Sequence, residues 1–272
     1  MMGNEDAYRQ FAAYYDVEYA AFDDDISFYR EFARQANGPI LELGCGTGRV
    51  LAALEDLGLP LAGVDTSDAM LAIARSRLSD RVLLGEWDMQ AVASCPALRN
   101  GPYFMAFSAI NTFLHLPDVD AQLDTLRSLR TIVVEGGLLL LDLMVPEPRY
   151  LSDQDGRLTL EFAGPLPDGN RLDKWAVRTH DLALQTIETT VLFDVTDSSS
   201  GVVTRVTDYY ATRYIHRFEL EHLLHRAGWK VVSLYGSYEL ELYDSGSERM
   251  LVLATWSDDN SRGESAGWRQ GN

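Results

Sequence analysis

The sequence predicts an α/β protein with a doubly wound, mostly parallel seven-stranded sheet and an antiparallel β insertion after strand five. Three observations predict it. The apolar run 40–43 leads into Gly44, Gly46 and Gly48 and then an amphipathic stretch, the pattern of a strand, a tight turn and a helix. The next apolar run ends in Asp65, where nucleotide-binding sheets place an acid against ribose. Finally, residues 157–214 lose helical periodicity.

The N-terminal region, residues 5–37, is predicted to be helical because its aromatic residues recur at helical spacing. Asp23 to Asp25 suit the start of a second helix, where carboxylates interact favourably with the helix dipole. Residues 47–57 predict the first crossover helix, which Gly58 ends. Thr66 or Ser67 is then expected to cap the helix that follows.

Continuous apolar runs predict the remaining parallel strands at 81–84, 103–108 and 138–144. A helix is expected to start at Pro117-Asp118 between the last two of these strands. Near the end of the chain, a predicted helix over 217–227 precedes two further strands, and the polar residues from 257 to 272 predict a disordered tail. The two late strands cover residues 229–236 and 250–256.

The predicted insertion consists of three or four β-rich runs with turns between them. Its alternate faces carry aromatic side chains that form either an acceptor pocket or the packing of a small sheet, and we keep both interpretations. The runs are 157–163, 171–181, 184–196 and 202–214, and the aromatic residues are Trp175, His180, Tyr209, Tyr210 and Tyr214.

Composition excludes several classes of protein. The chain has 272 residues, 46% hydrophobic and 24% charged, as in ordinary globular proteins. Its net charge of −18 argues against a nucleic-acid partner, which needs a basic surface. No apolar run approaches the ~20 residues that span a bilayer, so no membrane partner is expected. Two cysteines and an acidic start, Met1 to Asp6, predict a cytoplasmic protein without disulfides or a signal peptide.

The glycine turn does not match the dinucleotide fingerprint, because Arg49 stands where G-x-G-x-x-G requires its last glycine. Its spacing, Glu-x-Gly-x-Gly-x-Gly with a later acid, instead resembles motif I of class I S-adenosylmethionine-dependent methyltransferases. The resemblance covers roughly residues 8–145, with a weaker echo at 214–256, where the two late strands resemble that fold's closing antiparallel hairpin. It implies S-adenosylmethionine as the cofactor.

The resemblance also implies which residues surround the cofactor. Glu42 is an acid inside an apolar strand, which is unfavourable unless it is paired or serves a ligand. The segment Gly85-x-x-Asp88-Met89 resembles the one that reads adenine, with Asp88 accepting from the exocyclic amine. The implied cofactor-binding residues are Glu42, Gly44, Cys45, Gly46, Gly48, Asp65, Thr66, Met70, Asp88, Met89 and Ser108. No metal-ligand pattern is present, so no metal site is predicted.

The acceptor side is less defined by sequence. His115 follows the fourth strand, where loops face the ligand, so it is a candidate base; a histidine that packs or caps at a helix start is the alternative. Tyr14 and Tyr15 resemble the Tyr-Asp of a lid helix that contacts cofactor or acceptor, or they pack on the core. The loop 109–116 resembles small-molecule methyltransferases, and the whole set of features resembles bacterial amino-sugar N,N-dimethyltransferases.

These observations predict an enzyme that moves a methyl group to a nitrogen or oxygen of a small molecule by in-line displacement. The alternatives are an NAD(P)-binding oxidoreductase, a peptide or protein methyltransferase, and a cofactor-binding protein without catalysis. Residues 1–148 with 215–256 are expected to form the cofactor-binding domain. Residues 149–214 are expected to form the inserted subdomain, either a substrate lid or a homodimer contact.

Overall fold

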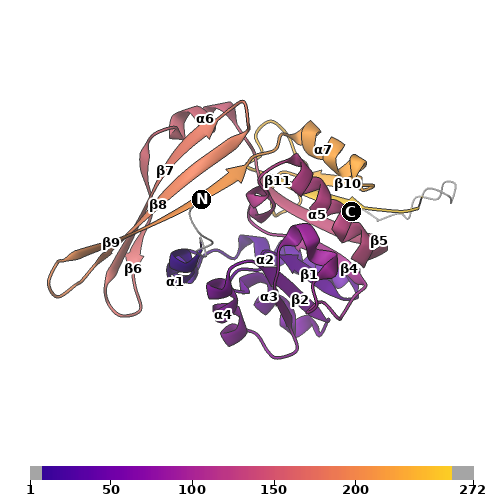
Figure 1. Cartoon of the computed structure of the whole chain (residues 1–272), viewed down its shortest axis with the longest axis horizontal. Helices are drawn as coiled ribbons and strands as arrows, with labels where there is room; N and C mark the ends of the chain where they lie inside the picture. The colour runs from indigo at the N-terminus through magenta and orange to yellow at the C-terminus, as the bar shows by residue number, and fades with distance from the viewer. Residues whose placement is uncertain (1–7, 259–272) are drawn as a thin grey trace.

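The computed structural model describes residues 8–258, and its centre is a seven-stranded sheet in the order β10-β11-β5-β4-β1-β2-β3 (Figure 1). Strand β11 runs antiparallel to both of its neighbours, β10 and β5, and the other neighbouring pairs of this sheet are parallel. The predicted fold class is therefore confirmed, including the closing hairpin. The strands are β1 (Ile40–Leu43), β2 (Leu61–Asp65), β3 (Leu83–Glu86), β4 (Tyr103–Ser108), β5 (Val133–Met144), β10 (Lys230–Tyr235) and β11 (Arg249–Thr255).

Helices cover both faces of this sheet, which is why its central strands are apolar on both sides. One buried cluster joins the sheet to α5 and α7, and the other joins it to α2, α3 and α4. The helices are α1 (Arg9–Glu18), α2 (Asp24–Ala36), α3 (Arg49–Leu54), α4 (Asp68–Arg77), α5 (Val119–Ile132), α6 (Pro148–Gln154) and α7 (Arg217–Arg226), with short 3₁₀ segments η1 (Glu55–Leu57), η2 (Met89–Ser94) and η3 (Thr112–His115).

Local sequence explains where these helices begin. Ser67 is the N-cap of α4, and its hydroxyl accepts a hydrogen bond from the backbone N–H of Met70 at 3.2 Å. Asp118 caps α5 in the same way and accepts from the N–H of Ala121 at 2.8 Å. Gly58 takes the left-handed conformation that ends the first crossover segment.

The N-terminal helical region is two helices, α1 and α2, and α2 begins at Asp24, where the sequence predicts the start of a second helix. Two strand boundaries differ from the sequence prediction. Strand β5 begins at Val133, earlier than predicted, and β3 lies slightly later than predicted. Helix α6 was not predicted, although Pro148 at its first turn is preset for a helix and Leu151 is buried.

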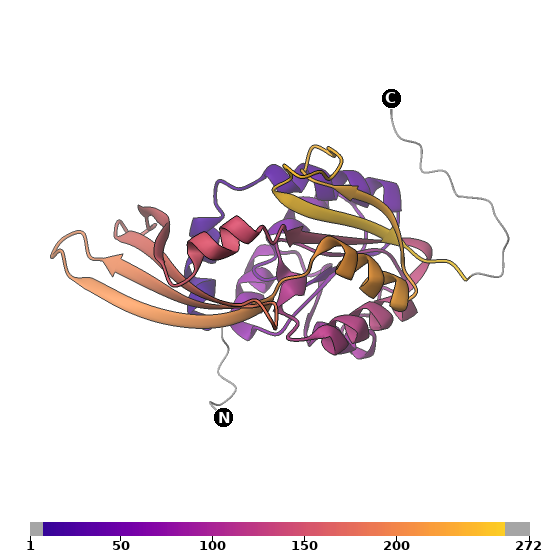
Figure 2. The same cartoon turned by 90° about the horizontal axis from the view of Figure 1, so that it is seen from above.

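The insertion is a separate four-stranded antiparallel sheet in the order β6-β7-β8-β9. Figure 2 shows it projecting from the α/β body as a curved blade with α6 lying across it. Helix α1 packs against this sheet, and the rings of Phe11 and Phe193 meet edge to face at 5.2 Å. The strands are β6 (Leu158–Pro165), β7 (Arg171–Asp181), β8 (Thr186–Thr196) and β9 (Val203–Arg213).

Two predictions fall outside the described residues: that the first six residues are not a signal peptide, and that most of the tail from residue 257 is disordered. Over residues 8–258 no helix combines the length and apolarity needed to cross a membrane.

Candidate functional site

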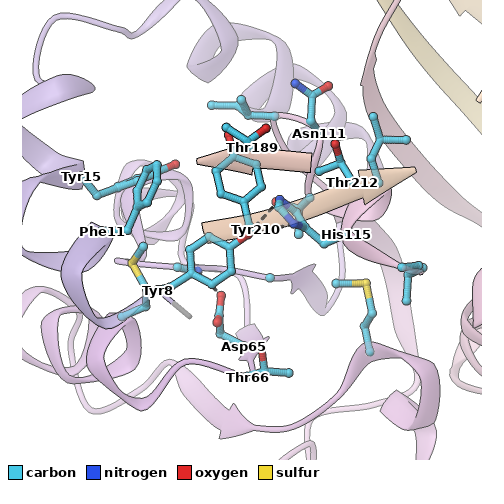
Figure 3. A pocket seen from close by; sticks show the side chains of 18 of the residues that line it. Tyr8, Phe11, Tyr15, Asp65, Thr66, Asn111, His115, Thr189, Tyr210 and Thr212 are labelled. Atoms are coloured by element: carbon cyan, nitrogen blue, oxygen red, sulfur yellow. Dashed lines mark hydrogen bonds between the residues drawn. The ribbon is translucent and has the colours of Figure 1, made fainter. Parts of the chain in front are cut away.

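A cavity of about 660 Å³ lies between the parallel sheet, α1 and the inserted sheet (Figure 3). Its walls come from the turn after β1, the end of β2, the segment after β3 and the loop after β4. Strands β6 to β9 and helix α1 supply the opposite walls. This volume is typical of sites for small molecules, and the carboxyl ends of parallel strands are where such folds bind them.

Two glycines form one wall of bare backbone. Gly44 and Gly46 line the cavity with φ values of +60° and +53°, a conformation that strongly favours glycine. A Cβ at Gly44 would lie 2.1 Å from the Thr112 Cγ2 atom. A Cβ at Gly46 would meet nothing within 4 Å. The main chain at Gly46 is therefore open to direct contact with a ligand.

Asp65 is fixed beside this glycine wall by two backbone donors. Its Oδ2 atom accepts from the N–H of Gly46 at 2.8 Å, and its Oδ1 atom accepts from the N–H of Ser67 at 2.8 Å. These two bonds hold the carboxylate in a fixed orientation, and a carboxylate is an acceptor of the kind that ligand hydroxyls bind. In Figure 3, Asp65 and Thr66 lie next to each other on one wall of the cavity.

Glu42 lies at the tip of β1, just before the glycine turn, and does not line the cavity. It is 3% exposed, and its Oε2 atom has no hydrogen-bond partner among the described residues. Burial raises the pKa of this carboxyl well above its ordinary value. A carboxyl left in this state is stabilised when a cationic group binds nearby, so the orphaned oxygen fits a positively charged ligand group at the turn.

The segment after β3 forms a third side of the cavity. Asp88 precedes η2 and is held by Gln90, whose N–H donates to Asp88 Oδ1 at 2.8 Å. Gln90 Nε2 also donates to Asp88 Oδ2 at 3.0 Å. Trp87 and Met89 line the cavity on either side of Asp88. These residues offer a carboxylate, a backbone amide and apolar surface, which fit the edge and face of a heterocyclic base.

The loop after β4 reaches the cavity in a strained conformation. Ile110 and Asn111 have φ values of 41° and 64°, unusual for residues with a Cβ. Strand β5 holds them there, since Ile110 N–H donates to Asp142 at 3.1 Å and Asn111 Oδ1 accepts from Met144 N–H at 2.5 Å. The loop is thereby held rigidly at the centre of the site.

His115 stands at the end of this loop in an aromatic cluster (Figure 3). Its Nδ1 atom lies 2.8 Å from the Tyr8 hydroxyl, and the ring of Tyr210 stacks on Tyr8 with centroids 6.1 Å apart. Burial lowers the pKa of His115 from 6.5 to about 4. His115 is therefore neutral near pH 7 and a weak base.

An ionic network forms the wall nearest the inserted sheet. The Lys174 ammonium contacts both carboxylate oxygens of Glu18, at 2.7 and 2.9 Å, and Glu161 at 3.2 Å. Arg178 pairs with the other oxygen of Glu161 at 2.5 Å. Sequence analysis did not single out these four residues; the only signal was the spacing of Lys174 and Arg178, which share one face of a predicted strand.

The structure brings nine of the predicted site residues to the cavity and leaves five away from it. Tyr14 packs on Phe193 with ring centroids 5.0 Å apart. Cys45, Gly48 and Ser108 are enclosed by protein, like Glu42. The residues at the cavity are Tyr15, Gly44, Gly46, Asp65, Thr66, Met70, Asp88, Met89 and His115.

Comparison with known proteins shows that this chain is similar to methyltransferases. The model of a methyltransferase domain family matches residues 11–234. A putative methyltransferase of Geobacillus sp. is 29% identical over 145 residues, which are 50% of this chain and 56% of the relative. A putative methyltransferase of Bacillus subtilis is matched over 54% of its length, so the chain spans just over half of these two relatives. The cypemycin N-terminal methyltransferase of a Streptomyces species is 26% identical over 79% of this chain and 81% of its own.

Solved structures share the whole architecture. The CcbJ methyltransferase from Streptomyces caelestis has a TM-score of 0.73 and 25% identity, covering 93% of this chain and 98% of its own. CalS10, an amino pentose methyltransferase from Micromonospora echinaspora, has a TM-score of 0.70 over 91% of this chain and 97% of its own. Its identity of 19% supports a shared fold.

Proposed function

Because the chain belongs to the methyltransferase domain family, we propose that it transfers a methyl group from S-adenosylmethionine to an amine nitrogen of a small molecule. One observation carries the proposal. A single cavity connects the bare glycine backbone and Asp65 with the inserted sheet, so it can hold a donor and an acceptor side by side. Under this proposal residues 149–214 form the acceptor-binding subdomain.

The donor end is built from rigid groups. Gly46 offers open main chain, and Asp65 and Asp88 offer carboxylates already fixed by backbone N–H groups. Glu42 is buried just behind the glycine turn, with a raised pKa and one carboxyl oxygen that has no partner among the described residues. S-adenosylmethionine, when bound, would supply an electrophilic methyl carbon, which the nucleophile attacks in line as the bond to sulfur breaks and the sulfur leaves as a neutral thioether. The protein contributes chiefly by holding the nucleophile in position, an effect worth several kcal/mol.

Aromatic side chains enclose the space between the two ends. Tyr8, Phe11, Tyr15 and Tyr19 come from α1 and its flanks, and all of them line the cavity. Burial raises the pKa values of Tyr8, Tyr15 and Tyr19, so these phenols stay neutral and can donate hydrogen bonds near pH 7. They exclude water from the reacting centre and orient the acceptor.

The state of His115 favours nitrogen over oxygen as the target. A hydroxyl acceptor needs a base to take its proton, whereas a neutral amine attacks through its lone pair. With a pKa of about 4, His115 is too weak a base to deprotonate a hydroxyl efficiently near pH 7. It suits a neutral hydrogen-bonding role beside Tyr8 instead.

The experiment that tests the proposal has two stages. Calorimetric titration should show binding of S-adenosylhomocysteine and no binding of NAD. Incubation with radiolabelled S-adenosylmethionine and matched panels of amines and phenols should then label amines preferentially. Binding of NAD alone would refute the proposal, and labelling of phenols alone would reassign the target atom to oxygen.

A peptide amine is a second candidate acceptor. The cypemycin N-terminal methyltransferase aligns with most of this chain, which favours an amine at a peptide N-terminus. Short peptides with free and acetylated N-termini belong in the same assay, because only free amines can be labelled under this alternative. A cytoplasmic location and a homodimer remain predictions from the sequence.

A further inference from the structure

Three cavity residues form one row across the inserted sheet. Arg178 on β7 is directly opposite Thr189 on β8, and Thr189 is directly opposite Tyr210 on β9. Directly opposed residues in antiparallel strands point to the same face, and all three line the cavity. Figure 3 shows Thr189 and Tyr210 at its upper wall. The row presents a guanidinium and two hydroxyl groups side by side.

The carboxylate oxygens near this row, which could accept hydrogen bonds, are already paired with cations. Both oxygens of Glu18 lie within 2.9 Å of the Lys174 ammonium. Glu161 directs one oxygen to Lys174 and the other to Arg178. The wall therefore has more free donors than free acceptors, because a guanidinium alone carries five N–H groups. A ligand group that fits it must be rich in acceptor oxygens.

The two cations of this wall, Lys174 and Arg178, differ in how many carboxylate oxygens surround them. Lys174 has a side chain only 6% exposed and three carboxylate oxygens around its ammonium. Its role is to join α1 to the inserted sheet. Arg178 pairs with a single carboxylate among the described residues, that of Glu161, and its side chain is 14% exposed. Arg178 is thus the cation with donors left for a ligand.

We infer that Arg178, Thr189 and Tyr210 bind an oxyanion, a carboxylate or phosphate group carried by the methyl acceptor. A planar guanidinium matches the two oxygens of such a group. Thr189 hydrogen-bonds to the Tyr210 hydroxyl, which keeps its own proton as a further donor on the same face. The inference rests on the proposed function and narrows its substrate class. The acceptor is then an amine whose other end is anionic.

The test uses probes in matched pairs. Each oxyanion probe is titrated into the protein alongside its neutral counterpart, with and without saturating S-adenosylhomocysteine. The acids are glycine, β-alanine and γ-aminobutyrate, each compared with its primary amide. The phosphate probe is aminoethyl phosphate, compared with ethanolamine. We expect at least one oxyanion probe to bind about tenfold more tightly than its neutral partner. Comparison of the acids with the phosphate tells which oxyanion the site prefers.

Arg178→Gln should abolish this preference while leaving the affinity for S-adenosylhomocysteine unchanged. Arg171→Gln is the matched control, since Arg171 lies on the same strand and is exposed. Its preference should equal that of the wild type. If Arg178→Gln weakens S-adenosylhomocysteine binding instead, Arg178 serves the cofactor and the inference is overturned.

Glu161→Gln should change the affinity for oxyanion probes in the opposite direction to Arg178→Gln. It removes the carboxylate that competes for Arg178, while Lys174 keeps Glu18. Oxyanion probes should bind this variant several-fold more tightly than the wild type, so the inference stays testable even if Arg178→Gln does not fold. Weaker binding, equal affinity for acids and amides, or no binding of any oxyanion probe overturns it. If the wild type does not bind S-adenosylhomocysteine at all, the proposed function is refuted, and this outcome is distinct from a failure of the oxyanion inference.

Discussion

Arg49 donates two hydrogen bonds to Asp25, with Nη1 at 2.9 Å from Oδ1 and Nη2 at 2.5 Å from Oδ2. Asp25 is fully buried on α2, and Arg49 is the first residue of α3, directly after the glycine turn. The residue that breaks the dinucleotide fingerprint thus ties the turn to the N-terminal helices. The ring of Phe22 lies 5.3 Å from the same guanidinium and adds a cation–π contact.

Asp25→Asn should destabilise the protein by about 3 kcal/mol, because it leaves the Arg49 charge without its buried partner. Urea unfolding of wild type and variant at pH 7 measures the difference. Asp56→Asn is the control, since Asp56 pairs with Arg30 on the surface with a side chain 67% exposed. Its unfolding midpoint should be close to that of the wild type. Equal effects of the two substitutions would contradict the importance of burial.

Gly46→Ala should abolish cofactor binding without unfolding the protein. The added Cβ meets no protein atom within 4 Å and enters the cavity space in which the proposed cofactor would contact the main chain. Backbone strain at positive φ should cost about 1–2 kcal/mol. Gly58→Ala is the matched control, because Gly58 has a φ of +69°, free space around it and no contact with the cavity. Titration with S-adenosylhomocysteine should separate the two variants; similar affinities would refute the glycine wall.

Glu42→Gln should stabilise the ligand-free protein and weaken cofactor binding. The raised pKa means that the folded carboxyl keeps its proton where the unfolded one has lost it, so wild-type stability falls as pH rises above about 4. Glutamine has no such titration, and we expect a gain of about 1–2 kcal/mol at pH 7 that disappears in acid. S-adenosylhomocysteine should bind about tenfold more weakly. Unchanged affinity would remove Glu42 from the site.

His115→Gln should make the stability of the protein less sensitive to acid. The unfolded histidine takes a proton below about pH 6.5, whereas the folded one does so only near pH 4. Wild-type stability therefore falls as pH drops through this interval, by roughly 3 kcal/mol in all. Urea unfolding between pH 4 and 7 tests this, with His222→Gln as an exposed control. Parallel curves for wild type and His115→Gln would contradict a buried neutral His115.

Much of the fold could be predicted because the residues that begin and end its helices and strands act on their immediate neighbours in the sequence. Glycines after β1, the acid that ends β2 and the caps of α4 and α5 each fix an element through its immediate neighbours. The alternation of the inserted strands likewise gave their bounds to within about two residues. Helix α6 was missed because its stabilisation comes from Leu151 packing against distant residues.

The acceptor side of the site could not be predicted in the same way. Glu18 and Lys174 form its central ion pair and lie 156 residues apart in the chain. No local pattern connects them, and only the packing of α1 against the inserted sheet brings them together. Tyr8 and His115, 107 residues apart, are a second example. The donor side was accessible to sequence analysis because backbone and neighbouring residues build it.

The two sheets keep separate hydrogen-bond ladders, although they share one cavity. Substitutions on the cavity face of β7, β8 and β9 therefore leave the strand order of the parallel sheet and its glycine turn untouched. Under the proposed function, evolution can alter the methyl acceptor without rebuilding the part of the cavity that holds the methyl donor. Descendants with new substrates are expected to diverge first at those three strands.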